Sequence, residues 1–182
     1  MKWPRIAALV SLVPLVIFWK DFQQLFFFHD DWELLNGYST LPFLRWLAQP
    51  FLGEGILPLF KLLWIAALHA AGGGYMAMIV LLWLTHVAIA LSFGYLLLRM
   101  ETPPLAASFA VLMFGLTWTN QETLMWSMQW SAQLALLFFF AAWWLLILIL
   151  ETPAPASGLT CLYTLSVLAS GLCSSRNMTG GA

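Results

Sequence analysis

The chain is dominated by long apolar runs that shorter polar stretches separate. Residues 75–98 form the clearest run, YMAMIVLLWLTHVAIALSFGYLLL, which ends at Arg99. Residues 131–150 form a second run, which ends at Glu151. An apolar run of about 18 residues or more can cross the hydrocarbon core of a bilayer as a helix, so both runs predict membrane spans.

Three further apolar runs predict additional crossings, at 4–19, 104–118 and 156–173. The first follows Lys2 and could be a secretory signal peptide, but bulky and charged residues stand where a small-residue cleavage site would lie. We expect an uncleaved span in which Pro14 is tolerated, because neighbouring helices can satisfy the freed carbonyl. Together the runs predict an all-α, polytopic transmembrane helical bundle of about five spans, a single membrane domain over residues 1–182.

Composition supports the membrane assignment. The chain is 62% hydrophobic and 8% charged, with a mean hydropathy of +0.87. A soluble domain would not have this composition, so the lipid bilayer is the expected partner. The net charge of -1 provides no basic surface for nucleic acid, and we expect no nucleic-acid partner.

The polar stretch 20–54 and the segment that follows it predict an external loop. Aromatic residues are interleaved with the charges of 20–54, which is typical of the membrane–water interface. The apolar segment 56–70 is short for a span and carries Lys61 near its middle, so we expect a helix lying against the membrane surface. The glycines at 72–74 predict a hinge or turn. Residues 20–74 are therefore expected to form an external loop with an interfacial helix.

The charges constrain the topology only in part. Arg99 fits a cytoplasmic end of the span at 75–98 under the positive-inside rule, but the basic residues alone do not settle the orientation. Six of the eight acidic residues fall on one face in this topology: Asp21, Asp30, Asp31, Glu33, Glu54 and Glu122.

The sequence His29-Asp30-Asp31-Trp32-Glu33 in this loop is the strongest candidate for chemistry. A carboxylate at the membrane surface could act as a general base towards an acceptor hydroxyl. Asp30 and Asp31 could also hold Mg²⁺ or Mn²⁺ beside a phosphate leaving group. The alternative is structural: either aspartate could cap a helix that begins near Trp32, with Glu33 in its first turn.

A second candidate face comprises Glu122, Trp126, Gln129 and Gln133. The last three residues follow Glu122 by four, seven and eleven positions, which places all four on one side of a helix. There a carboxylate, an indole and two amides could bind a sugar or a phosphate. The alternative is a polar helix end with aromatic anchors. His86 lies inside the run at 75–98, where a lone histidine is either hydrogen-bonded to a neighbouring helix or functional.

Four stretches together resemble the N-terminal part of the GT-C glycosyltransferases, and in particular the protein O-mannosyltransferase group. They are HDDWE at 29–33, GILPLFK at 55–61, LTH at 84–86 continuing to Leu98-Arg99, and QETLMW at 121–126 continuing to Gln133-Leu134. The sequence differs from relatives at Leu82, where they often have Asn, and at Gln129 and Trp130, where they have a basic residue.

The resemblance implies a membrane enzyme that transfers a sugar from a polyprenyl-phosphate donor to an acceptor hydroxyl. It implies Asp30 as the catalytic base with Asp31 as its partner, and substrate contacts from His29, Glu33, Glu122, Trp126 and Gln129. It also implies a bacterial inner membrane location, and the uncleaved first span predicts a cytoplasmic N-terminus.

Because that family has more than five spans, we expect the chain to be the N-terminal part of a larger protein, inactive on its own. The alternative is a non-enzymatic multi-span membrane protein or transporter fragment.

Overall fold

The structure is a computed structural model that describes residues 3–28, 30–51, 55–116, 123–153 and 157–173. The regular elements in these residues are helices, and extended backbone pairs among them only in an isolated bridge between Phe51 and Gly55. In chain order the elements are α1 (Trp3–Val10), α2 (Val13–Ile17), α3 (Trp19–Phe22), α4 (Asp30–Thr40), α5 (Phe43–Ala48), α6 (Pro58–Ala70), α7 (Tyr75–Arg99), α8 (Pro104–Leu116), the short 3₁₀ helix η1 (Ser127–Gln129), α10 (Trp130–Glu151) and α11 (Ser157–Cys173). The expected all-α fold is confirmed.

Two helices are long and apolar enough to cross a membrane. One is α7, and the other runs through η1 and α10 from Ser127 to Glu151. Each has 25 residues, or about 37 Å at 1.5 Å per residue, against a hydrocarbon core of about 30 Å. The other apolar helices have 10–17 residues: Pro4–Ile17, Pro58–Ala70, Pro104–Leu116 and Ser157–Cys173. The described residues therefore hold two helices of membrane length where the sequence predicts five spans.

The N-terminal apolar helical segment Pro4–Ile17 is interrupted by a turn. α1 ends at Val10 and α2 begins at Val13, with a turn between them. Proline lacks the N–H that would bond the carbonyl four residues earlier, here that of Val10, and its ring would clash with that carbonyl. The first span with a tolerated Pro14 stays a prediction. Pro14 lies in the first turn of α2, where its missing N–H leaves no helical bond unmade.

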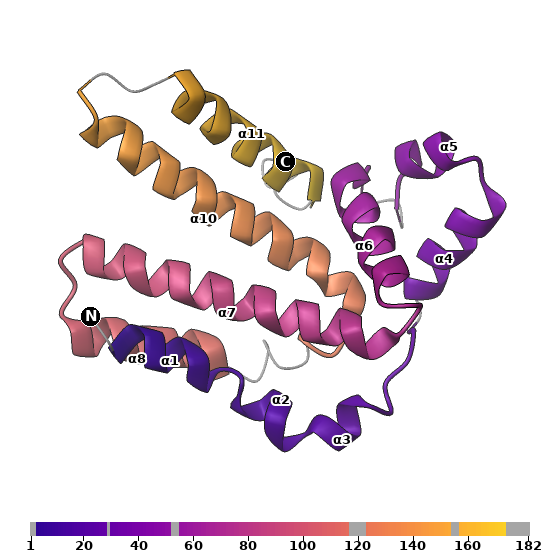
Figure 1. Ribbon diagram of the computed structural model, residues 1–182, viewed down its shortest axis with the longest axis horizontal. Helices are drawn as coiled ribbons and strands as arrows, with labels where there is room; N and C mark the ends of the chain where they lie inside the picture. Colours follow the sequence, from indigo (N-terminus) through magenta and orange to yellow (C-terminus); the bar gives the residue numbers. More distant parts are fainter. Residues whose placement is uncertain (1–2, 29, 52–54, 117–122, 154–156, 174–182) are drawn as a thin grey trace.

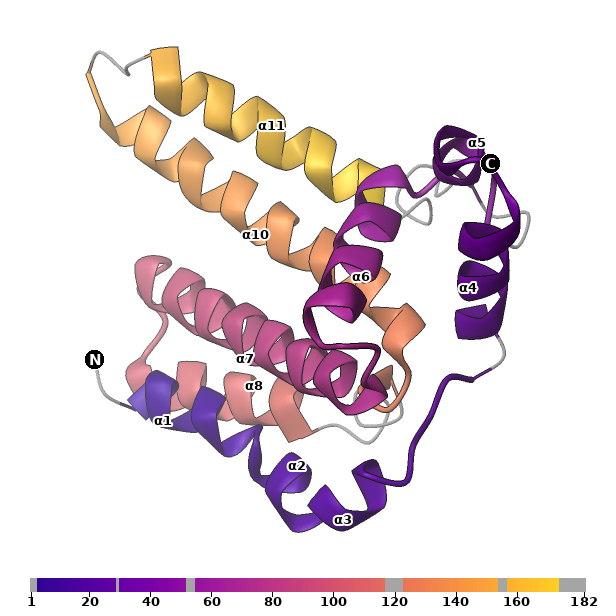
Figure 2. The same cartoon turned by 45° about the vertical axis from the view of Figure 1, so that its right-hand side comes forward.

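The long helices form a layer that α6 crosses at one end. α7, α10 and α11 lie side by side, and α1 with α8 covers the opposite flank of α7 (Figures 1 and 2). α6 contacts α7, α10 and α11, and α4 and α5 lie beyond it. Its inner face is buried, with Phe60 and Trp64 in the main core. The glycine turn predicted after this helix is present, because Gly72 and Gly73 adopt positive φ angles.

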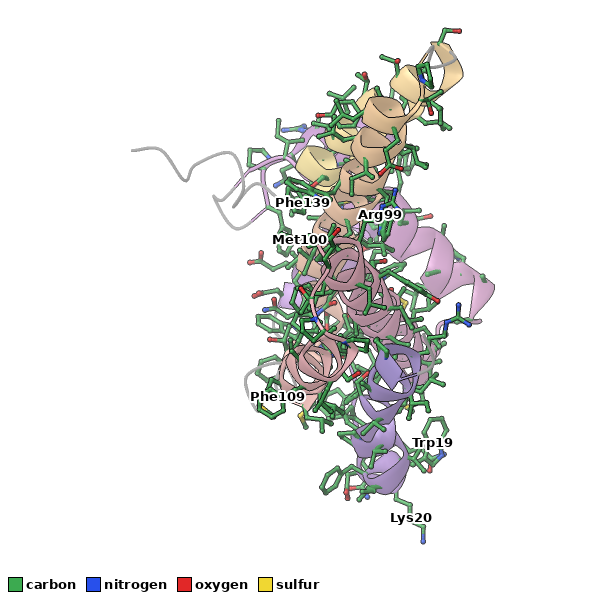
Figure 3. All side chains as sticks on the ribbon, turned by 90° about the vertical axis from the view of Figure 1, so that its left-hand side faces the viewer. Trp19, Lys20, Arg99, Met100, Phe109 and Phe139 are labelled. Atoms are coloured by element: carbon green, nitrogen blue, oxygen red, sulfur yellow. The ribbon has the colours of Figure 1, made fainter. Side chains whose placement is uncertain are left out.

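The two ends of the layer differ in composition. At one end, here called the polar end, the start of α7 and η1 meet α4 and α6. At the other, here called the Arg99 end, the Arg99 Nη2 donates to Glu151 Oε1 and joins the last residues of α7 and α10. The sequence places these two residues on the same side of the membrane, and in the structure they are in contact. Figure 3 views the molecule from the Arg99 end.

Candidate functional site

A buried hydrogen-bond cluster joins four elements at the polar end. The Ser127 hydroxyl donates to Asp31 Oδ1 at 2.6 Å and accepts from Trp64 Nε1 at 3.1 Å. The Ser127 N–H donates to the Tyr75 hydroxyl at 3.2 Å. These four residues, here called the Asp31–Ser127 cluster, come from α4, α6, α7 and η1, and all are buried. The cluster therefore fixes the start of α4, which carries the acidic residues Asp30 and Asp31 and is here called the acidic loop, against a segment 96 residues away in the chain.

Asp31 also organises the start of its own helix. Its Oδ2 accepts the Phe28 N–H at 3.0 Å, and its N–H donates to the Phe28 carbonyl at 2.7 Å. The sequence predicts an aspartate cap on a helix that begins near Trp32. In the structure α4 begins at Asp30, and the Asp31 carboxylate reaches back to the N–H that precedes the helix. Asp31 thus bonds an N–H that precedes the helix and does not act as its N-cap, and both Asp31 oxygens accept a hydrogen bond.

Burial dominates the electrostatics of Asp31. Removal from water raises the pKa of the carboxyl above its ordinary value, since the charged form loses hydration. Hydrogen bonds from Ser127 and the Phe28 N–H, with the nearby Tyr75 hydroxyl, oppose this by stabilising the ionised form, while the charge of Asp30 adds slightly to the rise. The net rise in pKa means that burial outweighs these bonds.

Aromatic side chains surround the cluster. Phe27 packs edge-on against Trp64 and Tyr75, with ring centroids 6.2 and 5.0 Å apart. Phe28 packs edge-on against Trp126 at 6.0 Å. The aromatic run before HDDWE therefore packs in part against the cluster, whereas the sequence suggests an interfacial role alone.

The structure brings some of the predicted site residues together and separates others. Asp30 and Asp31 are buried, and Glu33 is exposed on the same helix. Trp126 and Gln129 flank Ser127, and both are partly buried. The predicted substrate contacts His29 and Glu122 lie outside the described residues.

The predicted helical face that includes Trp126, Gln129 and Gln133 is wrong. Trp126 has extended backbone, with φ -126° and ψ 115°, and only the 3₁₀ turn of η1 precedes α10. A continuous helix would need the Ser127 N–H to bond a carbonyl four residues back, but it donates to the Tyr75 hydroxyl instead. The Gln133 Oε1 and the Trp126 Nε1 are both buried without a hydrogen-bond partner in the described part of the chain.

A cavity beside the acidic loop contains a buried lysine that the sequence analysis did not assign to the site. The Lys61 Nζ donates to the carbonyls of Trp46 and Gln49, at 2.6 and 2.7 Å, and so satisfies the end of α5. The cavity measures about 340 Å³, and its polar lining includes Glu33, Asn36, Gln49 and Lys61. Burial lowers the pKa of the Lys61 ammonium. Its position in an otherwise apolar segment was the sequence signal for this role.

No known protein-family model matches this chain, and no curated protein or solved structure matches it. The resemblance to the GT-C glycosyltransferases therefore stays a prediction from the quoted motifs. What the structure adds is the arrangement of the chain's own residues.

The expected Mg²⁺ or Mn²⁺ site at Asp30 and Asp31 stays a prediction. No group of three or more His, Cys, Asp or Glu side chains gathers anywhere in those ranges. Both oxygens of Asp31 already accept hydrogen bonds from protein donors. These bonds occupy part of the Asp31 carboxylate, which has about four acceptor positions on its two oxygens.

His86 packs between helices and is remote from the acidic loop in the chain. Its Nε2 lies 3.4 Å from the Gly115 carbonyl of α8, and its ring stacks on Phe114 at 5.0 Å. A carbonyl only accepts, so Nε2 carries the proton in this contact. Of the two readings that the sequence left open, the contact with α8 corresponds to the histidine bonded to a neighbouring helix.

Proposed function

We propose that the chain forms part of a membrane glycosyltransferase that transfers a sugar from a polyprenyl-phosphate donor to an acceptor hydroxyl. The observation that carries the proposal is the fixed position of the acidic loop at the polar end. The Asp31–Ser127 cluster holds the start of α4 against η1 and α7, so the acidic pair belongs to a defined buried structure. The resemblance in the four quoted motifs supplies the reaction class.

The arrangement supports a division of labour between the two aspartates. Asp31 is committed to Ser127 and Phe28 and acts as a positioning residue. Asp30, which immediately precedes it, takes the role of general base. It removes the acceptor hydroxyl proton as that oxygen bonds to the anomeric carbon, while the bond from that carbon to the phosphate oxygen breaks and the lipid phosphate leaves.

The cavity beside α4 offers a place for the polar part of a substrate. Glu33 and Leu34 line it, and they lie one helical turn beyond Asp30 on the same side of α4. Its volume of about 340 Å³ falls in the range of small-molecule sites, roughly 300–1,000 Å³. The buried ammonium of Lys61 gives the cavity a positive group, which suits a phosphate-bearing donor.

Membrane location is supported by the outer surface as well as by helix length. Phe109 of α8 and Phe139 of α10 are 62% and 51% exposed and lie on the outside of the layer (Figure 3). Extensive exposed apolar surface indicates contact with lipid or with another protein. We propose that α7 and α10 cross the membrane, with the polar end on the external side and the N-terminus in the cytoplasm of a bacterial cell.

A specific observation favours a second function. Asp31 and Lys61, two of the buried charged groups, both make bonds that hold helices or cap them. A non-enzymatic membrane protein would use them in the same way. A measurement of sugar transfer, and not of protein stability, must therefore distinguish the glycosyltransferase from the non-enzymatic membrane protein.

The test is sugar transfer by membranes that contain the full-length protein of which this chain forms part, with radiolabelled polyprenyl-phosphate mannose and glucose as donors. Asp30→Asn is expected to lower transfer by about 100-fold or more, the usual contribution of a general base, while unfolding behaviour stays close to that of the wild type. The matched control is Asp21→Asn, which changes an exposed acid in α3. Retained transfer in both Asp30→Asn and Asp31→Asn would contradict the proposal, and absence of transfer by the folded full-length wild type would favour the second function.

A further inference from the structure

An apolar crevice with a charged mouth lies between α7 and α10 at the Arg99 end. It measures about 410 Å³, and its inner wall is formed by Leu98, Ile147 and Leu148. Arg99 and Glu151 stand at its mouth, one on each helix. The crevice is at the opposite end of α7 from the Asp31–Ser127 cluster and plays no part in the proposed reaction.

Both charged groups at the mouth are accessible. The side chains of Arg99 and Glu151 are 52% and 47% exposed although they contact each other. The contact uses Nη2 of the arginine and Oε1 of the glutamate. A guanidinium has five N–H donors and a carboxylate has two oxygens, so each group keeps capacity for a further partner. The mouth thus presents a positive and a negative group side by side.

Aromatic residues line the crevice below the charged pair. Tyr95 lies one turn before Arg99 on α7, and its hydroxyl accepts a hydrogen bond from Arg5 of α1, whose guanidinium carbon lies 5.4 Å from the ring centroid. Trp144 lies two turns before Glu151 on α10. Tyrosine and tryptophan are enriched where a helix leaves the hydrocarbon core for the headgroup region. Along both helices the crevice therefore runs from aromatic through aliphatic to charged side chains, with the charged pair at its end.

We propose that this crevice binds a zwitterionic aminophospholipid, with phosphatidylethanolamine as its simplest form. The lipid phosphate contacts Arg99, the primary ammonium contacts Glu151, and an acyl chain lies against the wall formed by Leu98, Ile147 and Leu148. Charge complementarity favours this lipid, because its headgroup carries a negative phosphate and a positive ammonium, and the mouth of the crevice carries the positive Arg99 and the negative Glu151. The inference rests on the proposal that α7 and α10 cross a membrane.

The nearby charges do not favour an anionic lipid. Arg5 is engaged with Tyr95, and Glu101 lies in the turn that follows α7 with its side chain exposed. The described arginines and glutamates at this end balance, so no excess of positive charge is present. A phosphatidylglycerol headgroup would meet Glu151 without a compensating ammonium.

The experiment measures the lipid that the full chain retains after purification in detergent with equimolar phosphatidylethanolamine, phosphatidylcholine and phosphatidylglycerol. Phosphatidylcholine is the critical comparison, because its quaternary ammonium carries charge but cannot donate a hydrogen bond. We expect phosphatidylethanolamine to exceed it by about tenfold, the factor for one charge-assisted hydrogen bond.

Two variants separate the two contacts. Glu151→Gln is expected to abolish the preference for phosphatidylethanolamine over phosphatidylcholine, while Arg99→Gln is expected to lower retention of all three lipids. Arg45→Gln, which removes an exposed arginine of α5 near the polar end, is the matched control and is expected to change neither. Equal retention of the three lipids by the wild type, a preference for phosphatidylglycerol, or a preference that survives Glu151→Gln would overturn the proposal.

Flotation with liposomes separates this inference from the one on which it rests. Protein that fails to float with liposomes of any of the three lipids would contradict membrane insertion itself. Protein that floats with all of them and retains no preference contradicts the lipid site alone.

Discussion

The polar end and the Arg99 end each use an acidic side chain to join distant helices, but they do so in opposite environments. Asp31 is 0% exposed and both its oxygens accept hydrogen bonds from protein donors. Glu151 and its partner Arg99 are about half exposed. A buried polar cluster is costly to leave incomplete, whereas an exposed ion pair contributes little and can exchange partners. The polar end is therefore suited to fixed geometry, and the Arg99 end to reversible contacts.

The largest effect is expected from Asp31→Ala. The change removes the acceptor that Asp31 provides for the Phe28 N–H and the Ser127 hydroxyl, and should lower the free energy of unfolding by about 3 kcal/mol. The measurement is unfolding in mixed micelles with a rising fraction of sodium dodecyl sulfate, followed by tryptophan fluorescence. Asp21→Ala, at an exposed position in α3, serves as the control and should stay within about 0.5 kcal/mol of the wild type. Equal effects of the two changes would remove the distinction between buried and exposed acids.

Packing at the polar end provides the next test. A Cβ on Gly37 would lie 2.9 Å from Trp46 Cδ1, and Trp46 is itself buried under the Lys61 side chain. Because an indole ring cannot yield at this distance, Gly37→Ala should destabilise by about 2 kcal/mol. Gly171 of α11 has open space at the same position, so Gly171→Ala should be neutral or stabilise by up to about 1 kcal/mol. A neutral Gly37→Ala would show that α4 and α5 are not packed as described.

The pH dependence of stability gives a smaller effect with a definite sign. The pKa of the Asp31 carboxyl is raised in the native state, chiefly by burial. The native protein therefore keeps a proton that the unfolded chain has lost, and the free energy of unfolding falls as the pH rises from 3.8 towards the native pKa. The slope from one proton is at most about 1.4 kcal/mol per pH unit.

Asp31→Asn should flatten this part of the stability profile, since the amide does not titrate. Unfolding titrations of wild type and variant at several pH values make the comparison. Profiles that remain parallel would mean that Asp31 ionises in the fold as readily as in the unfolded chain.

The smallest effect is expected at the Arg99 end. Arg99→Gln removes an exposed ion pair and should lower the free energy of unfolding by about 0.5 kcal/mol. Addition of 0.5 M salt should weaken the wild type by a similar amount and leave the variant unchanged, because salt screens exposed charges. A loss comparable to that of Asp31→Ala would mean that this pair also fixes the fold.

Sequence reasoning succeeded where a pattern is long and local. The ends of α7 and α10 follow from uninterrupted apolar runs that stop at Arg99 and Glu151. It did not predict the turn before Pro14, because a proline in an apolar run is compatible with either a tolerated kink or a break. Packing decides between them, and in this fold the chain turns before Pro14.

The candidate site was predictable only in part. The acidic loop stands out because charge is rare in the chain, and Lys61 stands out for the same reason. Ser127 and Trp64 could not be found, since a single serine in a polar stretch and a tryptophan in an apolar helix carry no pattern. Their roles depend on Asp31, which is 96 residues from Ser127 in the sequence. The Ser127 N–H donates to the Tyr75 hydroxyl and makes no helical hydrogen bond, so Trp126 does not share a continuous helix with Gln129 and Gln133.

The most direct test of the account is a double-mutant cycle between Asp31→Ala and Ser127→Ala. The central claim is that a buried hydrogen bond between these side chains holds the acidic loop against η1. The free energies of unfolding of the wild type, both single variants and the double variant give the coupling between the two residues. The account predicts a coupling of about 1 kcal/mol or more. Effects that add to within about 0.3 kcal/mol would contradict it.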